Sequence, residues 1–185
     1  MRKVIVSNLV SLDGFFEGPN KELDWFVVDE EFFDYARDLL GTVDTILFGR
    51  VTYQMMESYW PAETDNDPVI TDKMNNLPKI VFSKTLSSTP WGKWNNARLV
   101  KENIPEEIRK MKQQAGKDMV IFGSGILVSD FTQLGLIDEY RIILNPVVLG
   151  KGNPLFKGLQ DKLNLKLLKT KTLSSGVVIL YYEPK

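Results

Sequence analysis

Apolar and β-branched residues cluster in short runs along the chain, and turn residues such as glycine, proline and serine separate the runs. Runs of this length and composition are typical of buried β-strands. We expect strands at residues 3–10, 42–49, 79–83, 97–101, 118–123 and 137–148, and two more within 165–183, joined by the turn Ser174–Gly176. The pattern therefore predicts a protein organised around a sheet.

Amphipathic segments lie between most of these runs. Residues 29–41 carry apolar side chains at helical spacing, with Asp29 as a candidate N-cap and Gly41 as a C-terminal stop. Further helices are expected at residues 50–60, 103–116 and 126–135. Two of them follow directly on strands that end in glycine.

The order of strands and helices predicts the fold class. Strands alternate with helices through most of the chain, and only strands follow at its C-terminal end. Such alternation is typical of an α/β protein, because consecutive parallel strands need a crossover helix. We expect one domain over residues 1–185, with a mainly parallel central sheet, helices on both faces and an antiparallel hairpin at one edge. Ligands of such sheets bind beyond the carboxyl ends of the strands.

The composition excludes several kinds of site. The 185 residues include no cysteine and no histidine, which excludes zinc sites built from them, thiolate nucleophiles and Ser-His-Asp triads, and we expect no metal site. The net charge is -1 and no long basic run is present, so neither nucleic acid nor a membrane is an expected partner. The chain begins with a segment too short and polar for a signal peptide, and the expected location is the cytoplasm.

Three of the expected strands end in groups that suit a phosphate: glycines that allow close approach, hydroxyls and cations. These groups are Gly49, Arg50 and Thr52 after one strand, Ser83 and Lys84 after the next, and Gly123, Ser124 and Gly125 after a third. Where a helix follows, its unpaired amides and partial positive charge add to the attraction. Together the three strand ends predict a dinucleotide site, and for each segment alone the alternative is a tight turn without a ligand.

A standard Rossmann domain is not expected. Its fingerprint needs a third glycine where Val128 stands, and an acid after the next strand where Asn145 stands. About 60 residues follow the Gly-Ser-Gly turn, which is too few for a second nucleotide-binding half.

Taken together, these segments resemble a known family. "VSLDG", "DTILFGRVTYQMM", "KIVFSKTL" and "DMVIFGSGILVSDFTQLGLIDEYRIILNPVVLGKGNPLF" occur in the order found in the dihydrofolate reductase-like superfamily. Within it, the chain resembles the reductase domain of bacterial riboflavin biosynthesis, the RibD C-terminal type, from about residue 3 to residue 183. The resemblance implies that fold and an NADPH-dependent reductase of a small nitrogen heterocycle, of the 5-amino-6-(5-phosphoribosylamino)uracil reductase type.

The resemblance also implies roles for particular residues. The turn of Gly49, Arg50 and Thr52 would hold NADPH phosphates, with Arg50 favouring the 2′-phosphate, and Ser83 and Lys84 would lie near the adenosine 2′-phosphate. The residues implied on the pyrophosphate and nicotinamide side are Gly123, Ser124, Gly125, Ile126 and Leu127. Relatives of this type are dimers, so a homodimer is implied, with the C-terminal strands as the candidate interface.

Two other functions stay open. One is a dihydrofolate reductase with a diverged pterin pocket, since the carboxylate of that enzyme's first helix aligns with Phe33, one place before Asp34. The other is a relative that binds a nucleotide without turnover. The zinc deaminase often fused to the riboflavin enzyme is excluded here, because its metal ligands are histidine and cysteine.

Hydride transfer from a nicotinamide also needs a proton source and a surface for the substrate. Asp13, after the first strand, and Asp34, on the first helix, are the candidate catalytic groups that contact the substrate or donate the proton. The alternatives are an Asp-Gly turn for Asp13 and a solvated helix face for Asp34. Trp25 and Tyr53 are the candidates to stack on a flat substrate, and packing in the core is the alternative for both.

Overall fold

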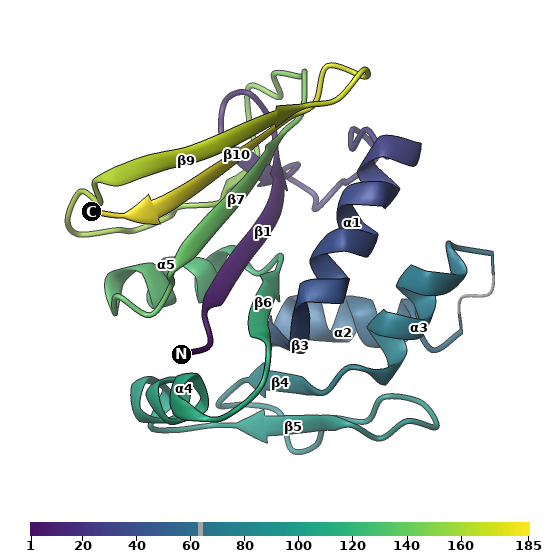
Figure 1. The fold of residues 1–185 in the computed structure, drawn as a ribbon, viewed down its shortest axis with the longest axis vertical. Coiled ribbons are helices and arrows are strands. Elements are labelled where there is room, and N and C mark those ends of the chain that lie inside the picture. Colours follow the sequence, from purple (N-terminus) through teal and green to yellow (C-terminus); the bar gives the residue numbers. More distant parts are fainter. Residues whose placement is uncertain (63–64) are drawn as a thin grey trace.

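The computed structural model describes residues 1–62 and 65–185, and those residues form one large sheet with helices on both faces (Figure 1). The helices are α1 (Glu30–Thr42), α2 (Arg50–Tyr59), α3 (Pro68–Asn76), α4 (Ile104–Gln113) and α5 (Gly125–Gln133). The strands of the large sheet are β1 (Val4–Val10), β3 (Val43–Gly49), β4 (Lys79–Phe82), β5 (Ala97–Val100), β6 (Asp118–Phe122), β7 (Glu139–Leu144), β9 (Leu165–Thr172) and β10 (Val178–Pro184). A separate two-stranded sheet pairs β2 (Phe15–Glu17) with β8 (Asn153–Pro154).

The strand order in the large sheet is β5-β4-β3-β6-β1-β7-β10-β9. All neighbours from β5 to β7 pair in parallel. The strand β10 then pairs antiparallel with both β7 and β9. The predicted fold class, a mainly parallel sheet with an antiparallel hairpin at one edge, is confirmed.

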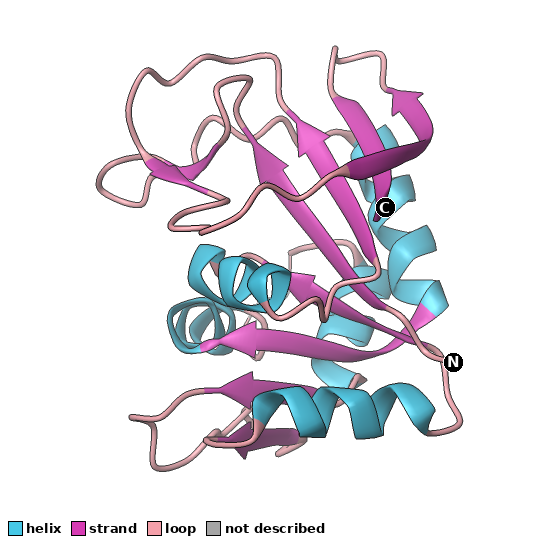
Figure 2. Cartoon of the chain, turned by 90° about the vertical axis from the view of Figure 1, so that its left-hand side faces the viewer, coloured by secondary structure: helices cyan, strands magenta, loops and turns pink. Residues whose placement is uncertain are grey.

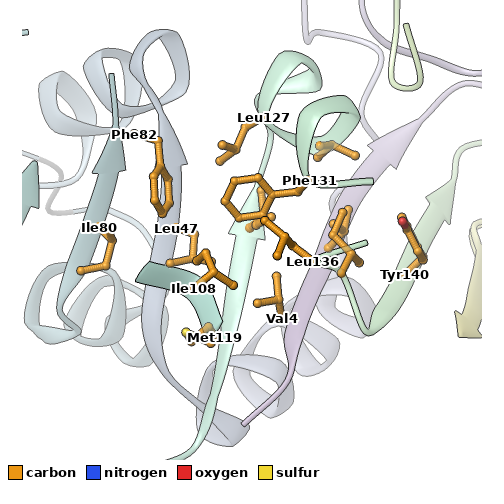
Figure 3. Packing of buried hydrophobic residues seen from close by; sticks show 14 of the residues in the cluster. Val4, Leu47, Ile80, Phe82, Ile108, Met119, Leu127, Phe131, Leu136 and Tyr140 are labelled. Carbon is orange, nitrogen blue, oxygen red and sulfur yellow. The ribbon is translucent and has the colours of Figure 1, made fainter. Parts of the chain in front are cut away.

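Seven strands of the large sheet, all except β9, contribute side chains to two hydrophobic clusters, one on each face, because successive side chains of a strand point to opposite faces. In β1, Val4 and Val6 belong to the cluster that packs against α4 and α5, whereas Ile5 belongs to the cluster under α1, α2 and α3. In the first cluster, Phe131 of α5 meets Phe82 of β4 edge-on, with 5.2 Å between ring centroids (Figure 3). Figure 2 looks onto this face, with α4 and α5 in front of the strands. Each fully buried side chain of this size stabilises the fold by about 1.5–3 kcal/mol.

The capping residue predicted for the first helix is confirmed, and the predicted stop is wrong. The Asp29 carboxylate accepts a hydrogen bond from the Phe32 amide at 2.8 Å. Helix α1 continues through Gly41 to Thr42 and ends where the chain enters β3. The turn between β9 and β10, at one edge of the large sheet, is as predicted. Gly176 has a positive φ of 89°, and the Leu173 amide donates to the Val177 carbonyl at 2.8 Å.

Two elements were not expected from the sequence. Helix α3 is capped by Asp67, whose carboxylate accepts from the Ile70 amide at 2.9 Å, and it has a proline in its first turn. Its short apolar face is formed by Ile70 and Met74. The second missed element is the β2–β8 pair, which joins two segments far apart in the chain. Within the described part of the chain, no helix has the length and apolar character needed to cross a membrane.

Candidate functional site

The helices α2 and α5 begin side by side at the carboxyl edge of the sheet. Each follows directly on a strand, β3 and β6, and these strands are parallel neighbours. The two helices then pack on opposite faces, α2 with the second cluster and α5 with the first. Such a reversal between neighbouring strands opens a crevice at their carboxyl ends, which is where ligands of open α/β sheets bind.

A cleft of about 580 Å³ lies at this crevice. It is lined by residues from six separate segments of the chain, which are Phe16, Glu17 and Lys21; Gly49–Thr52; Phe82–Thr85; Lys101 and Ile104; Ser124–Leu127 and Asp130; and Asn153, Pro154 and Lys157. Every residue expected from the sequence to hold the cofactor is in this lining except Gly123. The structure therefore brings the three strand ends together, as their position in a parallel sheet predicts.

The glycines of the two turns allow the turns to touch each other. A Cβ atom at Gly49 would overlap the Ser124 hydroxyl, and one at Gly123 would lie 3.0 Å from the Thr52 methyl group. Gly123 also has a positive φ of 62°. At Gly125, an added Cβ would lie 2.6 Å from the Phe16 ring. These glycines thus serve close packing between protein segments, and that packing brings the starts of α2 and α5 to one point.

Amide groups at the starts of the cleft helices have no side-chain partner. Helices α2, α4 and α5 begin without a capping side chain among the described residues, whereas α1 and α3 are capped by Asp29 and Asp67. All three uncapped helices have their first residue in the lining of the cleft. Free amides and the positive end of the helix dipole are the features that bind phosphate.

Charged side chains around the cleft favour an anionic ligand. The lining contains five cations, which are Lys21, Arg50, Lys84, Lys101 and Lys157, and two acids, which are Glu17 and Asp130. Arg50 is exposed and donates to the Gln54 side chain at 3.1 Å, one turn further along α2. Arg50 is the first residue of α2 and lines the cleft, so a phosphate bound at this helix start would have both a charged side chain and the amides within reach.

Another hollow, of about 570 Å³, lies between the starts of α1 and α3, and it is acidic. Its lining includes Glu30 and Asp67, and both carboxylates bind the Arg37 guanidinium, Glu30 at 2.6 Å and Asp67 at 2.5 Å. Asp34, also predicted as catalytic, joins this network at 2.6 Å. Asp34 therefore lies on the outer face of α1 and does not line the cleft.

The Asp13 carboxylate, a candidate proton donor, accepts hydrogen bonds from two loops in the structure. Its carboxylate accepts hydrogen bonds from the Ser11 hydroxyl at 2.7 Å and from the Leu149 and Gly150 amides at 3.1 and 2.7 Å. The Ser11 hydrogen bond, followed by those from the two amides, lowers the pKa of Asp13, and burial opposes them only in part. A carboxylate held in this way stays ionised at neutral pH and is a poor acid. It does not line the cleft.

The two aromatic residues predicted to bind the substrate also lie outside the cleft lining. Tyr53 is buried, packs on Trp91 with 6.2 Å between centroids, and donates its hydroxyl to the Pro90 carbonyl. Burial raises the pKa of Tyr53 to about 12. Because neighbouring helix residues point about 100° apart, Thr52 faces the cleft and Tyr53 faces the core. Trp25 is half-buried in the loop before α1 and donates to the Glu22 carbonyl at 3.1 Å.

Several lining residues were missed by the reasoning from sequence. Lys101 is the last residue of the strand predicted at 97–101, so the rule that identified Ser83 and Lys84 at the end of their strand identifies it as well. Phe16 and Lys157 carry no local signal, because tertiary contacts bring them to the cleft: Phe16 through the pairing of β2 with β8, and Lys157 through the hydrogen bond from its amide to the Ser129 hydroxyl of α5 at 3.0 Å.

Comparison with known proteins places the chain in a family. Residues 2–179 match the family model described as the RibD C-terminal domain. The chain belongs to this family. The uncharacterized protein YyaP of Bacillus subtilis (strain 168) is similar to it, with 39% identity over 98% of this chain and 95% of that protein.

Two solved structures have an architecture similar to that of this chain. The crystal structure of a putative riboflavin biosynthesis protein from Shewanella sp. PV-4 has a TM-score of 0.79 and 27% identity, and each chain covers 99% of the other. Dihydrofolate reductase from Enterococcus faecalis, in complex with NADP(H) and RAB-propyl, has a TM-score of 0.65 and 12% identity, over 99% of this chain and 96% of that one. The fold is therefore dihydrofolate reductase-like, as the sequence predicts.

Proposed function

We propose that the protein is an NADPH-dependent reductase of a small nitrogen heterocycle, of the 5-amino-6-(5-phosphoribosylamino)uracil reductase type. The observation that carries this proposal is the cleft where the uncapped starts of α2 and α5 meet beneath a set of cations. Membership of a reductase family supports the reaction class, and the likeness to the putative riboflavin biosynthesis protein supports the type.

The lining of the cleft fits a phosphorylated dinucleotide. The amides at the starts of α2 and α5, with Arg50 and Thr52, would hold the diphosphate. Ser83, Lys84 and Lys101, at the ends of β4 and β5, would hold the 2′-phosphate and select NADPH over NADH. NADPH, when bound, supplies the hydride.

The apolar part of the lining would receive the adenine and position the nicotinamide. Phe82, Ile104 and Leu127 lie in the lining near the charged strand ends, and Phe16 lies over the start of α5. The carboxylates that the structure brings to the cleft are Glu17 and Asp130, so these two, in place of Asp13 and Asp34, are the groups to test as proton carriers. Glu17 accepts a hydrogen bond from the Asn153 side chain at 2.8 Å.

The reaction is tested by following the loss of reduced nicotinamide absorbance when NADPH and the phosphoribosylaminouracil substrate are supplied together. We expect turnover by the wild-type protein and strong loss in Arg50→Ala. Arg109→Ala is the matched control, since Arg109 is an exposed arginine on α4 that does not line the cleft. NADPH binding without turnover of any heterocycle would favour a nucleotide-binding relative that is not an enzyme.

A dihydrofolate reductase is the second candidate, and the fold alone supports it. The pterin of that enzyme is bound by a carboxylate on the first helix, which aligns with Phe33 here, while the neighbouring Asp34 faces Arg37. Methotrexate that fails to compete for the site would exclude a folate pocket. We also propose that the protein acts in the cytoplasm as a homodimer through its C-terminal strands, where Leu167 and Leu168 of β9 are exposed; light scattering tests the dimer.

A further inference from the structure

The Asp13 carboxylate joins two loops that are far apart in sequence. The Ser11 hydroxyl, which is buried, donates to it from the loop after β1. The Leu149 and Gly150 amides donate to it from the loop after β7, some 136 and 137 residues further along the chain. Both carboxylate oxygens are used, since Leu149 binds Oδ1 and Gly150 binds Oδ2.

Further contacts make the two loops one unit. The Leu12 amide donates to the Val147 carbonyl at 2.7 Å, and the Leu155 amide donates to the Gly14 carbonyl at 3.1 Å. Beyond these bonds the loops continue into the β2–β8 pair, in which Glu17 lies opposite Asn153. The Asp13 bonds thus sit at the base of a two-stranded flap.

This flap forms one end wall of the cleft. Phe16 and Glu17 of β2, and Asn153 and Pro154 of β8, all line the cleft. The Phe16 ring is the atom group nearest to Gly125, at the start of α5. Strands β4 and β5 form the other end with Ser83, Lys84 and Lys101, and the flap contributes no residue there.

We propose that Asp13 is a positioning residue that holds the flap against the start of α5 and so sets the affinity of the cleft for the nicotinamide half of its ligand. The ligand named here rests on the proposed function, whereas the role of Asp13 in holding the flap does not. When the flap is already ordered in the free protein, ligand binding loses less conformational entropy. If the ordered flap is less populated in the free protein, the apparent affinity for the ligand falls in the same proportion.

The test compares a whole ligand with a fragment of it. Asp13→Asn keeps the size of the side chain, but its amide group would turn N–H toward a backbone N–H and lose one of the two loop bonds. We expect Asp13→Asn to raise the dissociation constant for NADPH about tenfold or more. The affinity for adenosine 2′,5′-bisphosphate, which occupies only the β4–β5 end, should stay unchanged. Asp161→Asn, an exposed aspartate in another loop, is the matched control and should change neither affinity.

Each outcome decides the proposal. Selective weakening of NADPH supports it. Equal weakening of both ligands would mean that Asp13 only stabilises the fold, and unchanged affinities would mean that the flap holds without it; either result overturns the proposal.

Hydrogen exchange provides a readout that needs no ligand. The Leu149 and Gly150 amides should exchange faster in Asp13→Asn than in the wild type, while core amides of β6 should not change. If the wild-type protein bound neither nucleotide, the proposed function would fail, and exchange at Leu149 and Gly150 would still decide the role of Asp13.

Discussion

Gly49 shows most directly how a single residue builds the cleft. A Cβ atom there would overlap the Ser124 hydroxyl and lie 3.1 Å from the Ser124 Cβ, so Gly49→Ala requires the Ser124 side chain to rotate and the two turns to shift slightly apart. We expect the substitution to lower the free energy of unfolding by about 1–3 kcal/mol, as overpacking does, and to weaken NADPH binding. Denaturant unfolding and calorimetric titration measure the two effects.

Gly41→Ala is the control at the same scale. Gly41 is inside α1 with open space around it, so an alanine there should leave binding unchanged and stabilise the helix by roughly 0.5–1 kcal/mol. If Gly49→Ala were as harmless as Gly41→Ala, the packing between the two turns would not be what positions the helix starts.

At the scale of elements, Lys79 closes the end of α3 from within the core. It is fully buried at the start of β4, and its ammonium donates to the Asn75 carbonyl at 2.6 Å and lies 4.3 Å from the centroid of the Trp91 ring. Burial lowers the pKa of Lys79 from its ordinary value of 10.5 to about 7. The unfolded chain therefore holds more protons than the folded one between about pH 7 and pH 10.5.

Stability should consequently rise with pH across that window, by about 5 kcal/mol, and level off below pH 7 where Lys79 is charged in both states. Lys79→Met should remove this rise, because methionine does not titrate. The fold should tolerate the substitution, because the Asn75 carbonyl keeps a hydrogen bond from the Asn96 side chain at 2.9 Å. Urea unfolding at a series of pH values makes the comparison. A wild-type profile that falls from pH 7 to pH 10 would show that Lys79 is not the group that titrates.

Most of the secondary-structure elements, although not α3, could be predicted from the sequence. Runs such as 43–49 and 118–122 consist mostly of apolar and β-branched residues, so their strands, their parallel pairing and the chemistry at their ends followed from local pattern and fold rules. Helix α3 was missed because Ile70 and Met74 are almost its whole buried face, which is too short a pattern to recognise.

Where the structure places a predicted site residue outside the cleft, the information missing from the sequence was tertiary. Tyr53 and Thr52 are adjacent, and only the docking of α2 decides which of them faces the cleft. Asp13 was predicted as a candidate catalyst with an Asp-Gly turn as the alternative, and its bonds to Leu149 and Gly150 are seen only in the structure, because nothing local in the sequence marks these partners.

For the whole molecule, the cleft is the place where segments from Phe16 to Lys157 meet, so a ligand bound there should stabilise the entire fold. NADPH at about 100 times its dissociation constant should raise the free energy of unfolding by about 2.7 kcal/mol. Thermal unfolding with and without NADPH measures this, and the Asp161→Asn protein should respond like the wild type. A melting temperature that stays the same at every NADPH concentration would contradict binding to the folded state.

The most direct test of the central claim, that this cleft is an NADPH site, is calorimetric titration of the wild-type protein and Arg50→Ala with NADPH and with NADH. We expect tight binding of NADPH, much weaker binding of NADH, and a loss of NADPH affinity in Arg50→Ala of about tenfold or more, as for a charge-assisted contact to phosphate. Equal affinity for the two nucleotides in both proteins, or no binding of either, would contradict it.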